Sequence, residues 1–242
     1  MKRMLITGTT QGIGYRIFNR FKDDYEIITI NRRNFAHVGF KGKNYICDLS
    51  DIEAVKSVVA QIVDKKIDVL INNAGGGEPI RFSDMQAEDL VKCTNLNYHA
   101  PILLMQAVIG GMKERGFGKI VNISSIASKA PRLFIPHYGA AKSALEKFSS
   151  SMAVYYGESG ISINCICPGG VKTDTSIKNR RQMAQLSGLE EDFYNKSMVD
   201  QNGLGRMILP DEVVDLVEFL LSDRAGAISG QVINICGTRE VR

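Results

Sequence analysis

Short apolar runs alternate along this chain with longer segments in which apolar residues return every three or four positions. The short runs are rich in β-branched residues, which favours strands over buried helices. In the longer segments, stripes such as Ile13, Ile17, Phe18 and Phe21 predict amphipathic helices. This alternation predicts an α/β fold with a doubly wound parallel sheet. The predicted strands are Met4–Thr7, Glu26–Ile30, Asn44–Cys47, Val69–Asn72, Lys119–Ile123, Ser162–Ile166 and Gln231–Ile235.

One stretch departs from the alternation. Residues 174–205 are polar, charge-rich and without a strand pattern, and they follow a Pro-Gly-Gly turn. Long segments of this kind in a compact domain usually carry function. We therefore expect residues 1–242 to form a single domain in which residues 174–205 act as a lid over a site.

Composition excludes several classes of protein. Hydrophobic residues make up 44% of the chain and charged residues 23%, which is typical of a globular domain. A net charge of +4 is too small to indicate nucleic-acid binding, although it suits an anionic cofactor. The N-terminus lacks the apolar stretch of a signal peptide, and no run approaches a membrane span. We therefore expect a cytoplasmic protein that binds neither nucleic acid nor a membrane.

The five cysteines form no C-x-x-C pair, and their odd number indicates a reducing compartment. Cys165 and Cys167 alternate in an apolar run, so both side chains lie on one face of a predicted strand. Because no histidine is near them in the sequence, we expect core packing and predict no metal site.

A glycine-rich turn joins the first predicted strand to the first predicted helix, with the spacing G-x-x-x-G-x-G. Glycine lets a backbone turn tightly and approach a pyrophosphate, and the helix N-terminus offers unpaired N–H groups to the phosphates. This position favours a dinucleotide-binding Rossmann-type domain. The cofactor contacts predicted here are Gly8, Thr10, Gln11, Gly12, Ile13 and Gly14.

The end of the second predicted strand distinguishes NAD from NADP. An acidic residue there binds the ribose 2′-hydroxyl of NAD, but this chain has Asn31, Arg32 and Arg33 instead. Without a carboxylate to repel a 2′-phosphate, and with arginine to bind one, we expect NADP(H) to be preferred over NAD(H). One arginine, Arg33 above all, can equally be solvated surface. Asp48 and Leu49 end the third predicted strand, where Asp48 can bind the adenine amino group or cap the next helix.

Tyr138 and Lys142 stand at positions i and i+4, which places a phenol and an ammonium on one face of a helix. A nearby cation stabilises a phenolate, as acid–base chemistry by tyrosine requires. Ser125 follows the fifth predicted strand and can reach the same carbonyl oxygen, although it can also cap a helix. The three histidines are expected to be exposed or hydrogen-bonded, because no G-x-S-x-G nucleophile motif accompanies them.

Together these motifs, with Asn72-Asn73-Ala74-Gly75, resemble the short-chain dehydrogenase/reductase family over the whole chain. The resemblance implies that Tyr138 transfers a proton, Ser125 orients the substrate carbonyl, and Lys142 binds the nicotinamide ribose and lowers the pKa of Tyr138. It also implies that Asn97 holds a water of the proton relay. Asn95 competes for that role, but Ala107-Val108 follow Asn97 at the family's spacing.

The resemblance implies further cofactor contacts and an assembly. The additional contacts are Asn73, Ala74, Gly75, Pro168, Gly169, Val171 and Thr173. Family members associate through the long helices that contain Asn97 and Tyr138, so a homotetramer or dimer is expected.

The C-terminal third resembles bacterial 3-oxoacyl-[acyl-carrier-protein] reductases. A 3-oxoacyl thioester is therefore the first expected substrate, and a sugar, polyol or other small ketone is the alternative. Three departures limit the likeness: the long lid, Gln11 in place of a basic residue, and a different C-terminal end. In the lid, Lys178, Arg180 and Arg181 can receive an acidic acyl-carrier protein or simply be solvated. A non-catalytic NADP-sensing regulator is the alternative from another class.

Overall fold

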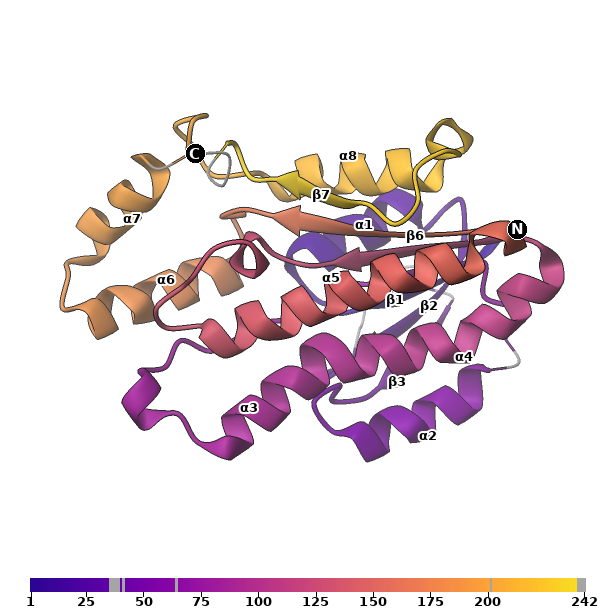
Figure 1. The fold of residues 1–242 in the computed structure, drawn as a ribbon, viewed down its shortest axis with the longest axis horizontal. Coiled ribbons are helices and arrows are strands. Elements are labelled where there is room, and N and C mark those ends of the chain that lie inside the picture. The colour runs from indigo at the N-terminus through magenta and orange to yellow at the C-terminus, as the bar shows by residue number, and fades with distance from the viewer. Residues whose placement is uncertain (35–39, 41, 64, 201, 239–242) are drawn as a thin grey trace.

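The computed structural model describes residues 1–34, 40, 42–63, 65–200 and 202–238. Within them, seven parallel strands form one sheet in the order β3-β2-β1-β4-β5-β6-β7 (Figure 1). Every strand lies where an apolar run predicted it, with ends that differ by at most two residues. The strands are β1 Arg3–Thr7, β2 Glu26–Asn31, β3 Lys43–Ile46, β4 Val69–Asn72, β5 Gly118–Ile123, β6 Ile161–Pro168 and β7 Val232–Ile235.

Helices cover both faces of the sheet. One face packs against α1 Gly12–Phe21 and α8 Pro210–Leu221, and the other against α2 Ile52–Ile62, α4 Ala100–Arg115 and α5 Pro136–Tyr156 (Figure 1). A π-helical segment, η2 Asn95–His99, joins α3 Ala87–Thr94 to α4. Short 3-10 helices are η1 Phe82–Asp84, η3 Ile126–Ser128, η4 Gly157–Ser159 and η5 Asp223–Ala225.

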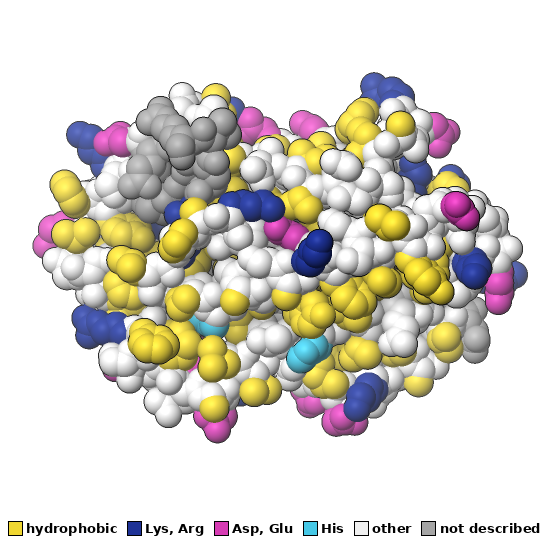
Figure 2. Space-filling model, viewed as in Figure 1, with side chains coloured by type: hydrophobic (Ala, Val, Ile, Leu, Met, Phe, Trp, Pro, Cys, Tyr) yellow, Lys and Arg dark blue, Asp and Glu magenta, His cyan; other side chains and the backbone are white. Residues whose placement is uncertain are grey.

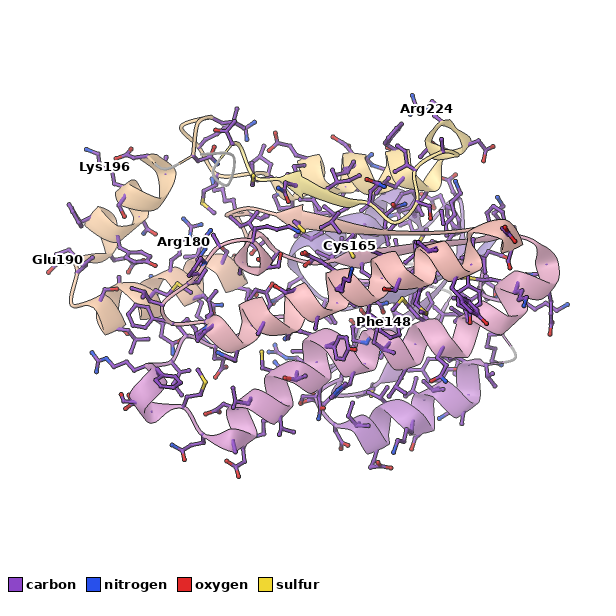
Figure 3. The ribbon with its side chains drawn as sticks, in the orientation of Figure 1. Phe148, Cys165, Arg180, Glu190, Lys196 and Arg224 are labelled. Atoms are coloured by element: carbon purple, nitrogen blue, oxygen red, sulfur yellow. The ribbon has the colours of Figure 1, made fainter. Side chains whose placement is uncertain are left out.

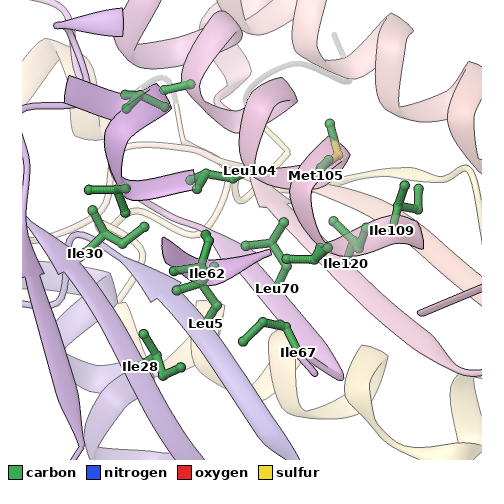
Figure 4. Packing of buried hydrophobic residues seen from close by; sticks show 14 of the residues in the cluster. Leu5, Ile28, Ile30, Ile62, Ile67, Leu70, Leu104, Met105, Ile109 and Ile120 are labelled. Carbon is green, nitrogen blue, oxygen red and sulfur yellow. The ribbon is translucent and has the colours of Figure 1, made fainter. Parts of the chain in front are cut away.

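The hydrophobic core lies in two layers because successive strand residues point to opposite faces. Leu5 and Leu70 belong to the layer under α2 and α4, part of which Figure 4 shows. Ile6 and Ile71, the next residue of each strand, belong to the layer under α1 and α8. The same alternation places Cys165 and Cys167 on one face, and all five cysteines are buried and free. This confirms the single-domain, doubly wound Rossmann-type fold.

The strand order reverses at β1. From β1 the chain builds outward through β2 to β3, whereas β4 pairs with the other side of β1. In open α/β sheets, ligands bind at such a switch point, outside the carboxyl ends of the strands. The glycine turn after β1 and the Asn73-Ala74-Gly75 segment after β4 therefore face the same crevice.

Residues 174–205 contain two helices, α6 Asp174–Ser187 and α7 Glu191–Asp200. Two amides hold α6 against the segment that follows β4. Asn179 Nδ2 donates to the Gly77 carbonyl at 3.2 Å, and Gln182 Nε2 donates to the Pro79 carbonyl at 2.8 Å. These contacts place α6 beside the carboxyl ends of the strands, as a lid requires.

Candidate active site

The turn between β1 and α1 requires glycine at three positions. Gly8 and Gly12 have φ of 72° and 60°, in the left-handed region that other residues rarely adopt. A Cβ on Gly14 would lie 2.1 Å from the Gly8 carbonyl oxygen. The turn is therefore tightly folded, and without side chains at these three positions a ligand can approach its backbone.

The N-terminus of α1 is suited to an anion. Among the described residues no side chain caps it, and its first turn contains no acidic residue, so its N–H groups and positive dipole are available to a ligand. Thr10 and Gln11 are exposed beside it, whereas Ile13 packs partly against the core. Gln11 Nε2 donates to Thr175 Oγ1 at 2.7 Å, which links the turn to the first turn of α6. A dinucleotide pyrophosphate fits this arrangement.

At the end of β2, the predicted cofactor residues separate into two kinds. Asn31 is buried, and its side-chain oxygen accepts from the Thr9 backbone N–H at 2.7 Å while its amide donates to Asn44. Asn31 thus braces the glycine turn and has its side-chain amide engaged within the protein. Arg32 and Arg33 are exposed, as binding to a 2′-phosphate requires.

At the end of β3, Asp48 is exposed and accepts hydrogen bonds from the backbone N–H and hydroxyl of Ser50. Burial alone would raise the pKa of Asp48, but these bonds and the charge of Arg32 hold it below its usual value. The cap of α2 is Asp51, so the alternative role of Asp48 as a helix cap is wrong. Leu49 is buried in the core.

After β4, Asn73 ties this strand to the glycine turn. Its Nδ2 donates to the carbonyls of Thr7 and Gly8 at 3.0 and 2.9 Å. The backbone N–H groups of Asn73 and Ala74 both donate to Thr7 Oγ1. Two of the predicted cofactor residues therefore shape the crevice by fixing the backbone on both of its sides.

Tyr138, Lys142 and Ser125 converge above β5. Lys142 is almost fully buried, and its Nζ donates to the Ile123 carbonyl at 2.7 Å and lies 5.8 Å from the centre of the Tyr138 ring. Ser125 Oγ accepts from the Ala127 backbone N–H at 3.1 Å, so it caps η3, and it also forms a hydrogen bond with Tyr138. The i, i+4 spacing therefore brings phenol, ammonium and hydroxyl together.

Burial shifts the two ionisable groups in opposite directions. It raises the pKa of Tyr138 to about 12, against a lowering effect of the hydrogen bond with Ser125. It lowers the pKa of Lys142 to about 8. Both shifts follow from the cost of a charge in a desolvated site. Without cofactor, the phenol is protonated at neutral pH, which is the form that donates a proton to a developing alkoxide.

Asn97 lies in the π-helical segment η2 and is fully buried. Its Nδ2 donates to the carbonyls of Gly76 and Cys93, both at 2.8 Å, and its Oδ1 accepts from the Gly76 backbone N–H at 3.0 Å. A Cβ on Gly75 would lie 2.8 Å from Asn97 Oδ1 and 3.0 Å from Lys142 Nζ. Asn97 thus adjoins the ammonium, whereas Asn95 donates to the Ser50 carbonyl instead.

A buried carboxylate behind the site was missed by the sequence prediction. Glu146, one helical turn beyond Lys142 on α5, accepts hydrogen bonds from Ser124, Ser128 and Cys167 and forms an ion pair with Lys129 at 2.7 Å. Burial would raise the pKa of Glu146, but these donors hold it below its usual value. The signal was a third polar residue at the four-residue spacing of Tyr138 and Lys142.

The segment after β6 runs toward the glycine turn. Val171 is buried and forms an isolated parallel bridge with Ile208. Thr173 caps α6 by accepting from the Ser176 backbone N–H, and its Cγ2 lies 3.4 Å from where a Cβ on Gly12 would be. The predicted contacts Pro168, Gly169, Val171 and Thr173 therefore border the crevice from the side of the lid.

The two described histidines, His99 and His137, make no hydrogen bond with Tyr138 among the described residues. His99 is exposed and its Nδ1 lies 2.9 Å from Asn95 Oδ1. His137 is buried, and within the described ranges its Nδ1 has no hydrogen-bond partner, so the expectation of a satisfied or exposed histidine is wrong there. Burial lowers the pKa of His137. His37 lies outside the described residues.

The basic cluster expected in the lid is divided. Lys178 and Arg181 are exposed, and Arg181 is paired with Glu191 at 2.8 Å. Arg180 is buried between α6 and the segment that precedes α8 (Figure 3). The three residues therefore form no common surface for an acidic protein, because helix periodicity turns Arg180 inward.

Two kinds of feature are absent from the described residues. Among them, no helix is long and apolar enough to cross a membrane, and no group of three or more histidine, cysteine or acidic side chains is arranged to hold a metal ion.

Comparison with known proteins supports this assignment of motifs. The model of the short chain dehydrogenase family matches residues 2–184, which is more than half of the chain. Acetoacetyl-CoA reductase of Shinella zoogloeoides is 32% identical, over 96% of each chain. The 3-oxoacyl-[acyl-carrier-protein] reductase of Rickettsia conorii is 30% identical, over 98% of this chain and 95% of that protein.

A solved structure shows the same fold. A single-residue variant of actinorhodin polyketide ketoreductase, crystallised with NADPH, superposes with a TM-score of 0.90 at 26% identity, over 100% of this chain and 98% of that one. The likeness to this structure and to the two relatives extends over 96% or more of the chain. The chain therefore belongs to the short-chain dehydrogenase/reductase family and is an NAD(P)-dependent oxidoreductase that acts on C=O and CH–OH groups.

Proposed function

We propose that this enzyme uses NADPH to reduce the ketone of a 3-oxoacyl thioester to a secondary alcohol. The observation that carries the proposal is the convergence of Ser125, Tyr138 and Lys142 at the carboxyl ends of the strands, beside a turn that fits a dinucleotide. An acid, a hydrogen-bond donor and a cation around one oxygen are what carbonyl reduction needs.

The proposal assigns roles to four catalytic side chains. Tyr138 donates a proton to the carbonyl oxygen, and Ser125 orients that oxygen with its hydroxyl. Lys142 binds the nicotinamide ribose, and its charge favours the phenolate that remains. Asn97, beside Lys142, holds a water of the proton relay. NADPH supplies the hydride for the carbonyl carbon when it is bound.

The cofactor preference is proposed from charge. Arg32 and Arg33 are exposed at the end of β2, and no acidic residue stands at that strand end, where NAD-selective domains place one. The ketoreductase with the similar fold contains NADPH. The glycine turn would hold the pyrophosphate, Asp48 and Leu49 would border the adenine, and residues 73–75 with the segment after β6 would border the nicotinamide.

The substrate is proposed from the relatives. Two of them are named for the reduction of 3-oxoacyl thioesters, one on coenzyme A and one on an acyl-carrier protein. An acyl-carrier protein is accordingly a candidate partner, although the burial of Arg180 removes one of the three cations expected to receive it. A sugar, polyol or other small ketone remains the alternative.

Assembly and location belong to the same proposal. Hydrophobic side chains gather over α4 and α5, and Val154 and Tyr155 of α5 are 85% and 71% exposed (Figure 2). An apolar surface of this kind suits contact with a second copy. We propose a homotetramer or dimer formed through these helices, located in the cytoplasm.

The test is NADPH consumption with acetoacetyl-CoA by the wild-type enzyme and by Tyr138→Phe. Loss of the proton donor should lower kcat by roughly a hundredfold or more. NADPH binding, followed by nicotinamide fluorescence, should persist in the variant and shows that the fold is intact. An unchanged kcat in Tyr138→Phe would overturn the assignment. If the wild-type enzyme oxidises NADPH with a sugar or another ketone but not with the thioester, only the substrate is wrong.

A further inference from the structure

The lid contains a pocket that the catalytic side chains do not line. It lies between α6, α7 and the segments around Lys172 and Met207, and its volume is about 390 Å³. Three cations line it, namely Lys172, Arg180 and Lys196, together with apolar side chains and one asparagine. No carboxylate is among its described lining residues. Figure 3 shows Arg180 and Lys196 on this side of the lid, with Glu190 at its far end.

Arg180 is the unusual member of this set. Only 8% of its surface is exposed, and its Nη2 lies 3.3 Å from Ser176 Oγ and 2.6 Å from Met207 Sδ. Within the part of the chain that the structure describes, it contacts no carboxylate. Arginine is almost never fully buried without a partner, because desolvating an unpaired charge is costly.

The remaining donors of Arg180 point to a ligand. A guanidinium has five N–H donors and stays charged even though burial lowers its pKa. Nε and Nη1 make no hydrogen bond among the described residues, and neither is a buried atom without a partner, so both remain open to solvent in a residue that lines the pocket. A planar donor group of this kind matches the paired oxygens of a carboxylate or a phosphate.

The place of the pocket connects it to the reaction. Lys172 stands between Val171 and Thr173, in the segment that borders the crevice. On another side of α6, Asn179 contacts the Gly77 carbonyl, and a Cβ on Gly77 would lie 2.5 Å from Tyr138 Cβ. One lid helix thus contacts the loop against Tyr138 and also supplies the buried cation.

We propose that Arg180, with Lys172 and Lys196, binds an oxyanion, a carboxylate or a phosphate, on the substrate at a distance from its reacting ketone. That the bound anion belongs to a substrate rests on the proposed function. Anion binding at this pocket does not depend on that function.

The first experiment measures anion binding without catalysis. Thermal unfolding is followed with inorganic phosphate and, separately, with acetate, each against chloride at equal ionic strength. We compare wild type, Arg180→Met and the control Lys178→Met, an exposed lysine of the same helix that does not line the pocket. Wild type and the control should gain Tm with the preferred anion, and Arg180→Met should lose most of that gain.

Ligand-free Arg180→Met should be at least as stable as wild type, because it no longer contains an uncompensated buried charge. If Arg180→Met does not fold, Lys196→Met, at an exposed position of the pocket, should show a smaller loss of the anion-dependent gain. An equal gain in wild type and the folded pocket variant would place the anions elsewhere, at the glycine turn for example, and would overturn the proposal.

The second experiment identifies the source of the anion. NADPH consumption is measured with ethyl acetoacetate, which is neutral, acetoacetate, which contains a carboxylate, and acetoacetyl-CoA, which contains phosphates. In Arg180→Met the KM of the anionic ketone that uses the pocket should rise about tenfold or more relative to that of the ester. A larger rise in the KM of acetoacetate would identify the bound group as a carboxylate. A larger rise in the KM of acetoacetyl-CoA would identify it as a phosphate.

The two proposals fail in different ways. If no ketone is reduced but the Tm gain depends on Arg180, the anion site stands and the proposed function falls. If all three ketones are reduced with unchanged KM ratios in Arg180→Met, the reductase stands and the assignment of the pocket to a substrate anion falls.

Discussion

Tyr138 and Lys142 show how burial changes the acid–base chemistry of two side chains in one site. Burial raises the pKa of the phenol to about 12 and lowers that of the ammonium to about 8. A cationic nicotinamide bound nearby would favour the phenolate. The spacing of these residues was readable from the sequence, because i and i+4 share a helix face.

The burial of two charged residues was beyond prediction. Glu146 and Arg180 are charged residues on helices, and such residues usually face solvent. Their burial depends on what packs against α5 and α6, namely Ser124, Cys167 and Met207. These contacts are distant in sequence, and no local pattern reports them.

We predict that Arg32→Glu reverses the cofactor preference. The substitution removes a donor for the 2′-phosphate and introduces the acid that binds a 2′-hydroxyl. The ratio of the Kd values for NADPH and NADH, measured by nicotinamide fluorescence, should change by about tenfold or more. Arg33→Glu is the matched control and should have the smaller effect. Equal changes of this ratio in the two variants would show that it depends on the overall charge and not on a contact made by Arg32.

We predict that Glu146→Gln lowers the free energy of unfolding at neutral pH by about 1–3 kcal/mol, because it breaks a buried charged network. The pKa of Glu146 is depressed in the folded state, so its contribution is present above the unfolded pKa and is lost as the pH falls through the folded pKa. Urea unfolding at neutral and acid pH should show the difference from wild type shrinking with acid.

The exposed Glu218, paired with Arg20, provides the control, and Glu218→Gln should change stability by well under about 1 kcal/mol. A difference between Glu146→Gln and wild type that stays constant from neutral to acid pH would contradict the account of the buried carboxylate.

At the scale of elements, apolar runs predicted all seven strands, because buried parallel strands have continuous hydrophobic sequences. β6 continues two residues past its predicted end, where Cys167 and Pro168 pair with β7. The lid helices α6 and α7 were expected only as a polar segment, because they bury few residues. The π-helical turn η2 has no sequence signature of its own.

The glycine turn is the element whose geometry can be tested most simply. In Gly14→Ala, the new methyl group would lie 2.1 Å from the Gly8 carbonyl oxygen and 2.3 Å from Asn73 Nδ2, so the turn must open. We predict at least a tenfold weaker binding of NADPH by fluorescence titration, and a lower Tm.

The control is Gly110→Ala in α4, where an added methyl group meets nothing within 4 Å. There the change should stabilise the protein by up to about 1 kcal/mol, because alanine has the higher helix propensity. Normal NADPH affinity in Gly14→Ala would show that the closed turn is not needed for binding.

In the molecule as a whole, the parallel sheet brings the candidate site residues of its loops to the carboxyl ends of the strands. The turn after β1, the segment after β4, Ser125 after β5 and Thr173 after β6 all lie at carboxyl ends of strands. The alternation of strands and helices predicted a doubly wound parallel sheet. It did not predict the order of the strands, because it does not show which strands pair with each other. The position of α6 across this edge depends on single contacts, such as the bond from Gln11 to Thr175.

The most direct test of the central claim is a nicotinamide fluorescence titration of the protein with NADPH and with NADH, followed by addition of acetoacetyl-CoA. We expect tighter binding of NADPH, and then loss of its fluorescence as the thioester is reduced. Failure of the protein to bind either nucleotide would contradict it.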